Sequence, residues 1–130
     1  MAYQRTVCID LDGTIAAYDH WRGPEHFGAP LPGVQSALAK LKDNGWRIII
    51  FTTRGDKGLV LAYLNQHQIP FDFINENPDQ PPQANPGKPI ADIYIDDRAL
   101  TFQGDWRKTT SEVETFHIWY KEEGDDTSPY

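Results

Sequence analysis

The sequence has 130 residues, the size of one ordinary domain that can bury a single hydrophobic core. Its composition, 39% hydrophobic and 24% charged, is typical of a globular protein, and no apolar run approaches the length of a membrane span. The formal net charge of −7 argues against a broad surface for nucleic acid or for an anionic membrane, although a local basic pocket stays open. The N-terminus does not resemble a signal peptide and Cys8 is the single cysteine, so we expect a cytoplasmic protein with a reduced, buried thiol.

The first predicted element is a strand over residues 5–11, because its apolar residues are nearly continuous and rich in β-branched types. It runs into the sequence DLDGT, which places Asp10 and Asp12 two positions apart. Side chains two apart on a strand emerge on the same side, so both carboxylates can face one ligand. Gly13 lets the backbone bend and approach that ligand closely, which makes it a candidate substrate-binding residue.

Residues 17–30 are rich in glycine, proline and aromatic residues, so we expect an irregular flap with no regular helix. The flap leaves directly from the DLDGT motif, which favours a role in substrate selectivity. Its side chains suited to stacking or hydrogen bonding are Tyr18, His20, Trp21, His26 and Phe27. Of these, His20 and Trp21 are candidate substrate-binding residues, although packing onto a small core explains flap aromatics equally well.

Apolar residues at helical spacing predict a helix over residues 32–44, and an apolar run predicts a strand over 46–51. That strand ends in Thr52, Thr53 and Arg54. A second helical pattern follows it around residues 59–64, and residues 71–75 form a short candidate strand.

A proline- and asparagine-rich stretch then predicts a loop that ends near Lys88. The last strong strand, over 91–95, again terminates in paired carboxylates, Asp96 and Asp97. We expect a closing helix within residues 109–122 and a disordered acidic tail over 124–130.

Strands that alternate with helices predict an α/β fold with a doubly wound, mostly parallel, Rossmann-like sheet and helices on both faces, in one domain over residues 1–123. In such sheets the functional crevice lies beyond the carboxyl ends of the strands, where all the polar strand-end residues above fall. Asp10, Asp12, Asp96 and Asp97 would repel one another there unless a cation binds. Hard oxygen ligands next to a phosphate suit Mg²⁺.

The DLDGT motif, the strand ending in FTT, the later lysine and the IDD sequence together resemble the four motifs of the haloacid dehalogenase-like (HAD) superfamily. The resemblance implies that Asp10 is a nucleophile that forms an aspartyl-phosphate and that Asp12 is the general acid and base. It also implies that Thr52 donates a hydrogen bond to the transferring phosphoryl group and that Lys88 neutralises its charge.

The same resemblance implies a Mg²⁺ site formed by Asp10, the backbone carbonyl of Asp12 and one residue of the last acidic pair. Asp97 matches the direct ligand better, so Asp96 would orient Lys88 or a bound water.

Several residues keep alternatives at this point. We expect Thr53 to cap the following helix if it does not contact substrate. Arg54 either contacts a substrate phosphate or pairs with Asp97, and Arg98 is expected to be a structural ion-pair partner. Lys88 lies in a Pro-Gly-Lys-Pro loop, where a solvated lysine is the alternative to a catalytic one.

The gaps in which larger HAD proteins insert a cap domain are short and irregular here, so the chain is similar to small capless members and to the phosphatase half of phage polynucleotide kinases. This resemblance implies a Mg²⁺-dependent phosphatase acting on a phosphorylated small molecule or on the phosphorylated end of a macromolecule. Two alternatives stay open: a catalytically silent HAD-fold module that binds a phosphorylated ligand, and a nucleic-acid end-processing phosphatase that uses a local patch of Arg54, Arg98 and Lys88. The sequence does not identify the substrate or the oligomeric state.

Overall fold

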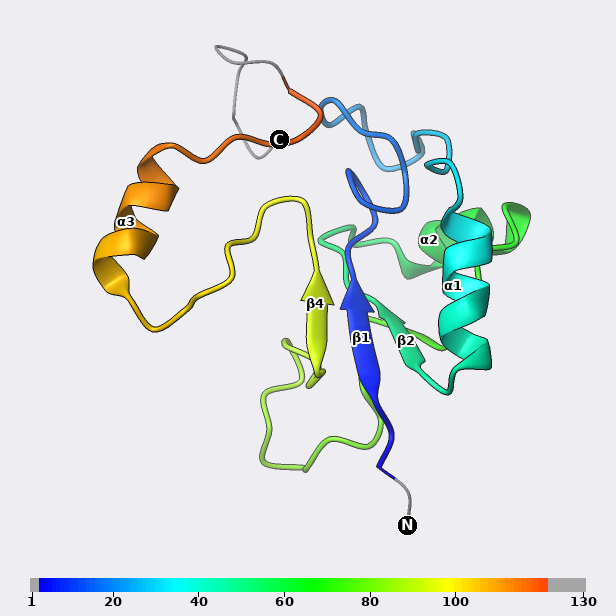
Figure 1. The fold of residues 1–130 in the computed structure, drawn as a ribbon. Coiled ribbons are helices and arrows are strands. Elements are labelled where there is room, and N and C mark those ends of the chain that lie inside the picture. Colours follow the sequence, from blue (N-terminus) through cyan, green and yellow to red (C-terminus); the bar gives the residue numbers. More distant parts are fainter. Residues whose placement is uncertain (1–2, 122–130) are drawn as a thin grey trace.

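The computed structural model describes residues 3–121, so the acidic tail expected over 124–130 lies outside the described residues. Four short strands form one parallel sheet in the order β3-β2-β1-β4: β1 (Thr6–Ile9), β2 (Arg47–Ile50), β3 (Phe73–Ile74) and β4 (Ile93–Ile95). Three helices accompany them: α1 (Val34–Asp43), α2 (Lys57–Gln66) and α3 (Trp106–Glu114) (Figure 1). The predicted α/β fold with a parallel sheet is therefore confirmed, and the described residues contain no cap domain.

The core lies between the sheet and two helices on one of its faces. Val7 and Ile9 of β1 and Ile48 and Ile50 of β2 belong to one hydrophobic cluster with buried side chains of α1 and α2. Alternation along a strand puts these four side chains on the same face of the sheet. Both helices lie on that face because β1, β2 and β3 follow one another in one direction through right-handed crossovers.

The sequence predicted helices on both faces of the sheet, but on the opposite face the described residues place the proline-rich stretch between β3 and β4, which was itself expected to be a loop. Cys8 and Ile49 point to this face and are buried. The loop over residues 75–92 crosses it on the way from β3 to β4, with Pro89 fully buried and its carbonyl oxygen 3.9 Å from the Cys8 Sγ. The prolines of this loop remove backbone donors and prevent a regular helix, so the expected helical cover of both faces is replaced on this side by loop.

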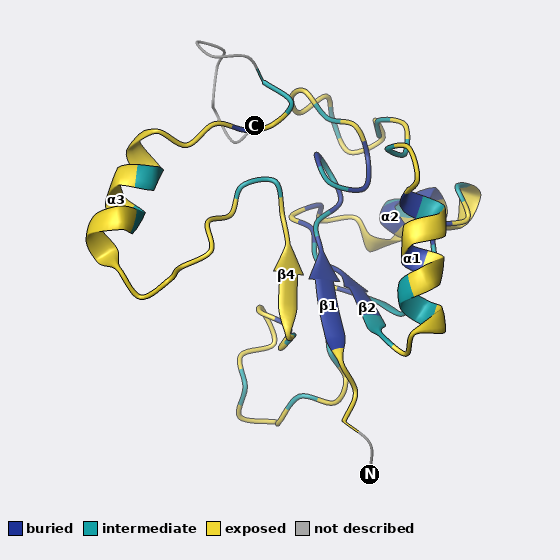
Figure 2. Cartoon of the chain, in the orientation of Figure 1, coloured by how far each residue is buried: buried dark blue, intermediate teal, exposed yellow. Residues whose placement is uncertain are grey.

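Helix α3 differs most from expectation. It spans Trp106–Glu114 instead of lying within 109–122, because the Asp105 carboxylate caps it by accepting from the backbone N–H groups of Arg107 and Lys108. No residue of α3 is buried, and the helix stands apart from the sheet, on the side of the edge strand β4 (Figure 1). The residues of β4 are themselves exposed (Figure 2). Among the described residues, no helix is long and apolar enough to cross a membrane.

The strand order reverses direction at β1. From β1 the chain moves outward through β2 and β3, then returns to place β4 on the other side of β1. The carboxyl ends of β1 and β4 therefore form the topological switch point, which is where open α/β sheets bind ligands. The sequence pattern thus directs attention to the residues that follow these two strands.

The burial difference between β2 and β4 yields a stability prediction. Ile50 is 0% exposed, so Ile50→Ala should lower the free energy of unfolding by about 2–5 kcal/mol in urea denaturation. Ile93 on β4 is 47% exposed, so the matched Ile93→Ala variant should cost well under half as much. Equal losses would mean that β4 is covered in solution and would contradict the arrangement described here.

Candidate active site

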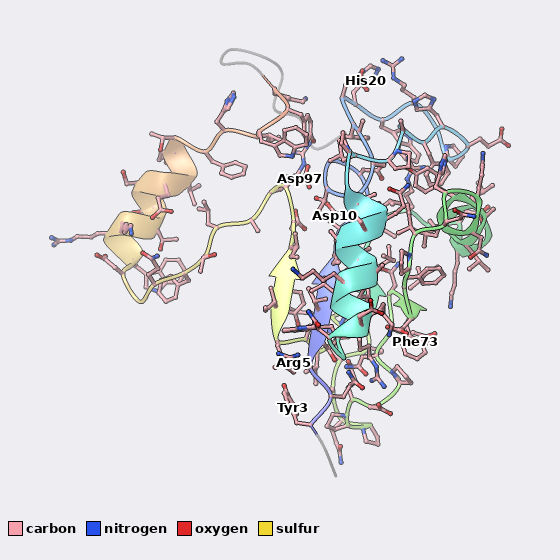
Figure 3. All side chains as sticks on the ribbon, turned by 45° about the vertical axis from the view of Figure 1, so that its right-hand side comes forward. Tyr3, Arg5, Asp10, His20, Phe73 and Asp97 are labelled. Atoms are coloured by element: carbon pink, nitrogen blue, oxygen red, sulfur yellow. The ribbon has the colours of Figure 1, made fainter. Side chains whose placement is uncertain are left out.

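Three aspartates converge at the switch point. Asp10 directly follows β1, and Asp96 and Asp97 follow β4. Each offers a carboxylate oxygen, and these three oxygens lie within 4.8 Å of one another. The backbone N–H of Asp10 donates to the Ile95 carbonyl at 2.9 Å and so ties the two strand ends together. Figure 3 shows Asp10 and Asp97 at the same end of the sheet, opposite Tyr3 and Arg5.

Burial, together with the neighbouring carboxylates, raises the proton affinity of Asp10 and Asp96. Burial raises the pKa of Asp10 to about 9, with a further contribution from its hydrogen bond with Asp97 and from the charge of Asp96. The pKa of Asp96 is also raised, first by burial and then by the neighbouring Asp97 carboxylate. The Oδ1 atom of Asp97 is buried and has no hydrogen-bond partner among the described residues. These carboxylate oxygens are possible metal ligands, and some of them hold protons or lack a hydrogen-bond partner among the described residues. Such a cluster fits a hard divalent cation such as Mg²⁺.

Gly13 makes close packing of the cluster possible. Its φ is +82°, and a Cβ added there would lie 2.3 Å from Asp97 Oδ2 and 2.7 Å from a ring carbon of Tyr120. Its N–H donates to the Ala16 carbonyl at 2.8 Å, which closes the turn after Asp12. Only glycine fits this position, for both backbone and steric reasons.

Asp12 is held by an arginine that the sequence did not pair with it. The Nε of Arg54 donates to Asp12 Oδ2 at 2.8 Å, and its NH2 group donates to Oδ1 at 2.9 Å. The Arg54 side chain is 5% exposed and that of Asp12 is 17% exposed, so this bidentate ion pair is shielded from water. The expected alternative, pairing of Arg54 with Asp97, is wrong.

Arg54 also fixes the flap. Its guanidinium donates to the carbonyls of Pro24 and His26, at 3.2 and 2.7 Å, and its Cζ lies 3.8 Å from the centroid of the Phe27 ring. Phe27 in turn stacks on Tyr63 of α2 at 4.7 Å between ring centroids. The inner part of the flap is therefore packed against the domain, and Phe27 belongs to the core rather than to a substrate surface.

The two threonines after β2 have separate environments. Thr52 is buried, its N–H donates to Asn75 Oδ1 at 2.8 Å, and its Oγ1 accepts from the Arg54 N–H at 3.1 Å. Thr53 is exposed and does not cap α2, because the Asp56 carboxylate takes that place by accepting from the Leu59 N–H. The expected capping role of Thr53 is therefore wrong, while both threonines line the same cleft as the aspartates.

That cleft has a volume of about 680 Å³ and brings most of the predicted residues together. It is lined by the three clustered aspartates, by the Asp12–Arg54 pair and also by Tyr18, Trp21 and Arg98. Trp21 is 44% exposed and its ring centroid lies 5.1 Å from Arg54 Cζ.

Three predicted residues do not line the cleft: Gly13, which packs against Asp97, and Lys88 and His20. Lys88 is exposed, with its Nζ 5.2 Å from the centroid of the Tyr94 ring. His20 is exposed near Asp19, and Figure 3 shows it far from Asp10 on the flap. Their proposed roles stay predictions.

Sequence reasoning missed part of the site. It left Arg54 open between a substrate phosphate and Asp97, and it did not indicate Asp12 as the partner of Arg54. Asn75 ends β3 and holds the Thr52 backbone, and the rule of polar residues at strand ends would have found it. Trp119 and Tyr120 also reach the site, and no spacing in the sequence indicated this.

Comparison with known proteins finds no matching family model and no matching curated protein. A solved structure of a conserved protein from Bacteroides thetaiotaomicron is similar to this chain, with a TM-score of 0.61 and 24% sequence identity over 92% of this chain and 100% of that one. Similarity at this level of identity supports the shared fold alone.

The raised pKa of Asp10 predicts how stability depends on pH without metal. Between about pH 4 and about pH 9 the folded state holds a proton that the unfolded state has lost, so stability should fall as the pH rises through this range. Thermal denaturation in EDTA should show this decline, and Asp10→Asn should flatten it. An unchanged slope in the variant would mean that Asp10 is not the group that holds the proton.

Proposed function

We propose that this chain is a Mg²⁺-dependent phosphomonoester hydrolase of the HAD type, acting through an aspartyl-phosphate. The observation that carries the proposal is the convergence of Asp10, Asp96 and Asp97 at the switch point, with their oxygens within 4.8 Å, next to an oriented Asp12. The order and strand-end positions of the HAD-like motifs support it. The capless cleft supports a substrate that need not be fully enclosed.

In the first step an Oδ of Asp10 attacks the phosphorus atom, and the bond between phosphorus and the leaving oxygen breaks. Asp12, in its protonated form, gives its proton to the leaving oxygen and releases the alcohol. The products are a free alcohol, an aspartyl-phosphate on Asp10 and the Asp12 carboxylate.

In the second step Asp12 takes a proton from a water molecule, which attacks the phosphorus atom. The bond between phosphorus and Asp10 breaks, inorganic phosphate leaves, and both aspartates return to their starting forms. The net reaction consumes one water molecule for each phosphate released.

The contact with Arg54 is compatible with proton transfer by Asp12. Each carboxylate oxygen has two lone pairs, and the two Arg54 donors occupy one on each oxygen. The remaining lone pairs can hold a proton or accept one from water. Arg54 acts as a positioning residue in this scheme because it fixes the direction in which they point.

Asp10, Asp97 and the backbone carbonyl of Asp12 would hold the Mg²⁺, and Asp96 would support them. When bound, the ion supplies positive charge that favours the ionised carboxylates and offsets the charge of the phosphoryl group. The Thr52 hydroxyl already accepts from Arg54 and still has its own proton to donate to a phosphoryl oxygen.

The alternative of a nucleic-acid end-processing phosphatase loses its main support. It required a local basic patch of Arg54, Arg98 and Lys88, but Arg54 is paired with Asp12 and Lys88 does not line the cleft. A silent binding module has the same cleft, so turnover decides between it and the enzyme. We therefore favour a small phosphorylated substrate.

Asp10→Asn should abolish Mg²⁺-dependent phosphate release from aryl phosphates while the protein stays folded, because a carboxamide keeps the shape but is not a nucleophile. Release of inorganic phosphate, measured with and without Mg²⁺ over sugar phosphates, nucleotides and 3′-phosphorylated oligonucleotides, tests both the reaction and the substrate class. Full turnover by pure Asp10→Asn protein would exclude the nucleophile assignment, and a wild-type protein that binds these ligands without releasing phosphate would favour the silent module.

Arg54→Lys should lower kcat by about 10²-fold, because a lysine keeps the charge but cannot hold both oxygens of Asp12. It should also weaken the flap contacts, so the melting temperature must be recorded alongside turnover. Arg22→Lys is the matched control, since Arg22 forms an ion pair with Asp19 on the exposed part of the flap. Equal kcat values for the two variants would argue against the positioning role of Arg54.

A further inference from the structure

The chain returns to the site after α3. Residues 117–121, which we call the C-terminal strap, pass beside the turn that follows β1 (Figure 1). Ile118 is 3% exposed and anchors the strap in the domain, although every residue of the preceding helix lies outside the core. The strap therefore packs on the domain, and the functional scheme above gives it no role.

Trp119 holds the DLDGT turn from outside. Its indole Nε1 donates to the Gly13 carbonyl at 2.8 Å, across 106 positions of sequence. The other bonds of this turn, such as Gly13 N–H to the Ala16 carbonyl, are local. The indole therefore supplies a restraint from a distant part of the chain on the peptide between Gly13 and Thr14.

Tyr120 lies against the acidic cluster itself. Its ring packs where a Cβ on Gly13 would point, next to Asp97 Oδ2. Its hydroxyl oxygen accepts from an NH2 group of Arg98 at 3.2 Å. The ring also makes edge contacts with Tyr18 and Trp119, at 6.0 and 5.6 Å between centroids, which restrict its orientation.

The Arg98 contact has a consequence for Asp97. Arg98 Nε lies 3.9 Å from Asp97 Oδ2, too far for a hydrogen bond. Asp97 Oδ1 has no hydrogen-bond partner within residues 3–121, although the Asp97 side chain is only 2% exposed. A neighbouring guanidinium would ordinarily close on such a carboxylate with two hydrogen bonds. The Tyr120 hydroxyl holds one end of Arg98 and so keeps Asp97 available.

We propose that Trp119 and Tyr120 are positioning residues of the cation site: Trp119 fixes the Gly13 turn against which Asp97 packs, and Tyr120 keeps Arg98 from neutralising Asp97. This inference rests on the proposed function for the identity of the cation. It differs from that function in assigning a role to a segment outside the four motifs.

The test measures Mg²⁺ binding by the change in melting temperature and by calorimetry, independently of turnover. Trp119→Phe removes the donor and keeps a ring, and Tyr120→Phe removes only the hydroxyl. Each should raise the Mg²⁺ concentration at half-effect by about 3- to 10-fold, the size expected for one lost hydrogen bond. At saturating Mg²⁺, kcat should stay within about twofold of wild type, because neither side chain takes part in proton or phosphoryl transfer.

Two controls separate this role from general destabilisation. Trp106→Phe changes a 70% exposed tryptophan on α3, and Tyr3→Phe removes a hydroxyl that donates to Asp92 at the opposite end of the sheet (Figure 3). Neither should change the Mg²⁺ midpoint. In an Arg98→Met background, Tyr120→Phe should have a smaller effect on the midpoint than in the wild type, because only the contact of the hydroxyl with Asp97 is then left to lose.

The outcomes distinguish the two proposals. If the wild type binds Mg²⁺ and releases phosphate but the strap variants keep its Mg²⁺ midpoint, the strap inference is overturned alone. If the strap variants shift the midpoint but the wild type releases no phosphate from any substrate, the proposed hydrolase function is overturned alone. A wild type that binds no Mg²⁺ would overturn both.

Discussion

Carboxylates brought together in a partly buried site repel one another unless positive charge or protons lie between them. This constraint governs the end of the sheet at which β1 and β4 terminate. The chain meets it in two different ways. Asp12 receives a permanent counter-charge from Arg54, while Asp10, Asp96 and Asp97 have no ion pair of comparable geometry with the described residues. The pKa values of Asp10 and Asp96 are raised instead.

These two environments match the two roles that the proposed function gives to the aspartates. In the proposed mechanism Asp12 gives a proton and then accepts one, which requires a fixed orientation, and the planar guanidinium of Arg54 provides it. Carboxylates that bind a cation benefit from being left without a competing cationic side chain. Arg98 is the nearest such competitor of Asp97, and its bond to Tyr120 explains how it can lie next to the cluster without closing on it.

The strands and the acidic cluster were predictable from sequence because both depend on local pattern. Continuous apolar runs identify β1 and β2, and the parallel topology then brings Asp10 next to Asp96 and Asp97. The partner of Asp12 was not predictable, because which carboxylate an arginine meets depends on how the flap folds back. The expected bounds of the closing helix, 109–122, were wrong because α3 begins at its Asp105 cap, a local signal that the sequence analysis did not use.

The prediction that helices cover both faces of the sheet was also wrong. A connection that returns across β1 needs no helix if a proline-rich loop can bury enough surface, as Pro89 does against Cys8. Because a loop takes the place of a helix on this side of the sheet, β4 is exposed and α3 has no buried residue. The site is consequently well ordered on the β2 side, through Arg54 and Asn75, and depends on the C-terminal strap on the β4 side.

The 106 positions that separate Gly13 from Trp119 have a consequence for biosynthesis. A ribosome makes the chain from its N-terminus, so β1, its turn and the Arg54 contact are available well before the strap is translated. Contacts between residues so distant in sequence carry a large loop-closure cost and tend to form late. The acidic cluster should therefore pass through a stage in which Asp10 and Asp12 are already in place but the Gly13 turn is not yet held. Full metal affinity would then be reached only after the strap has packed on this turn.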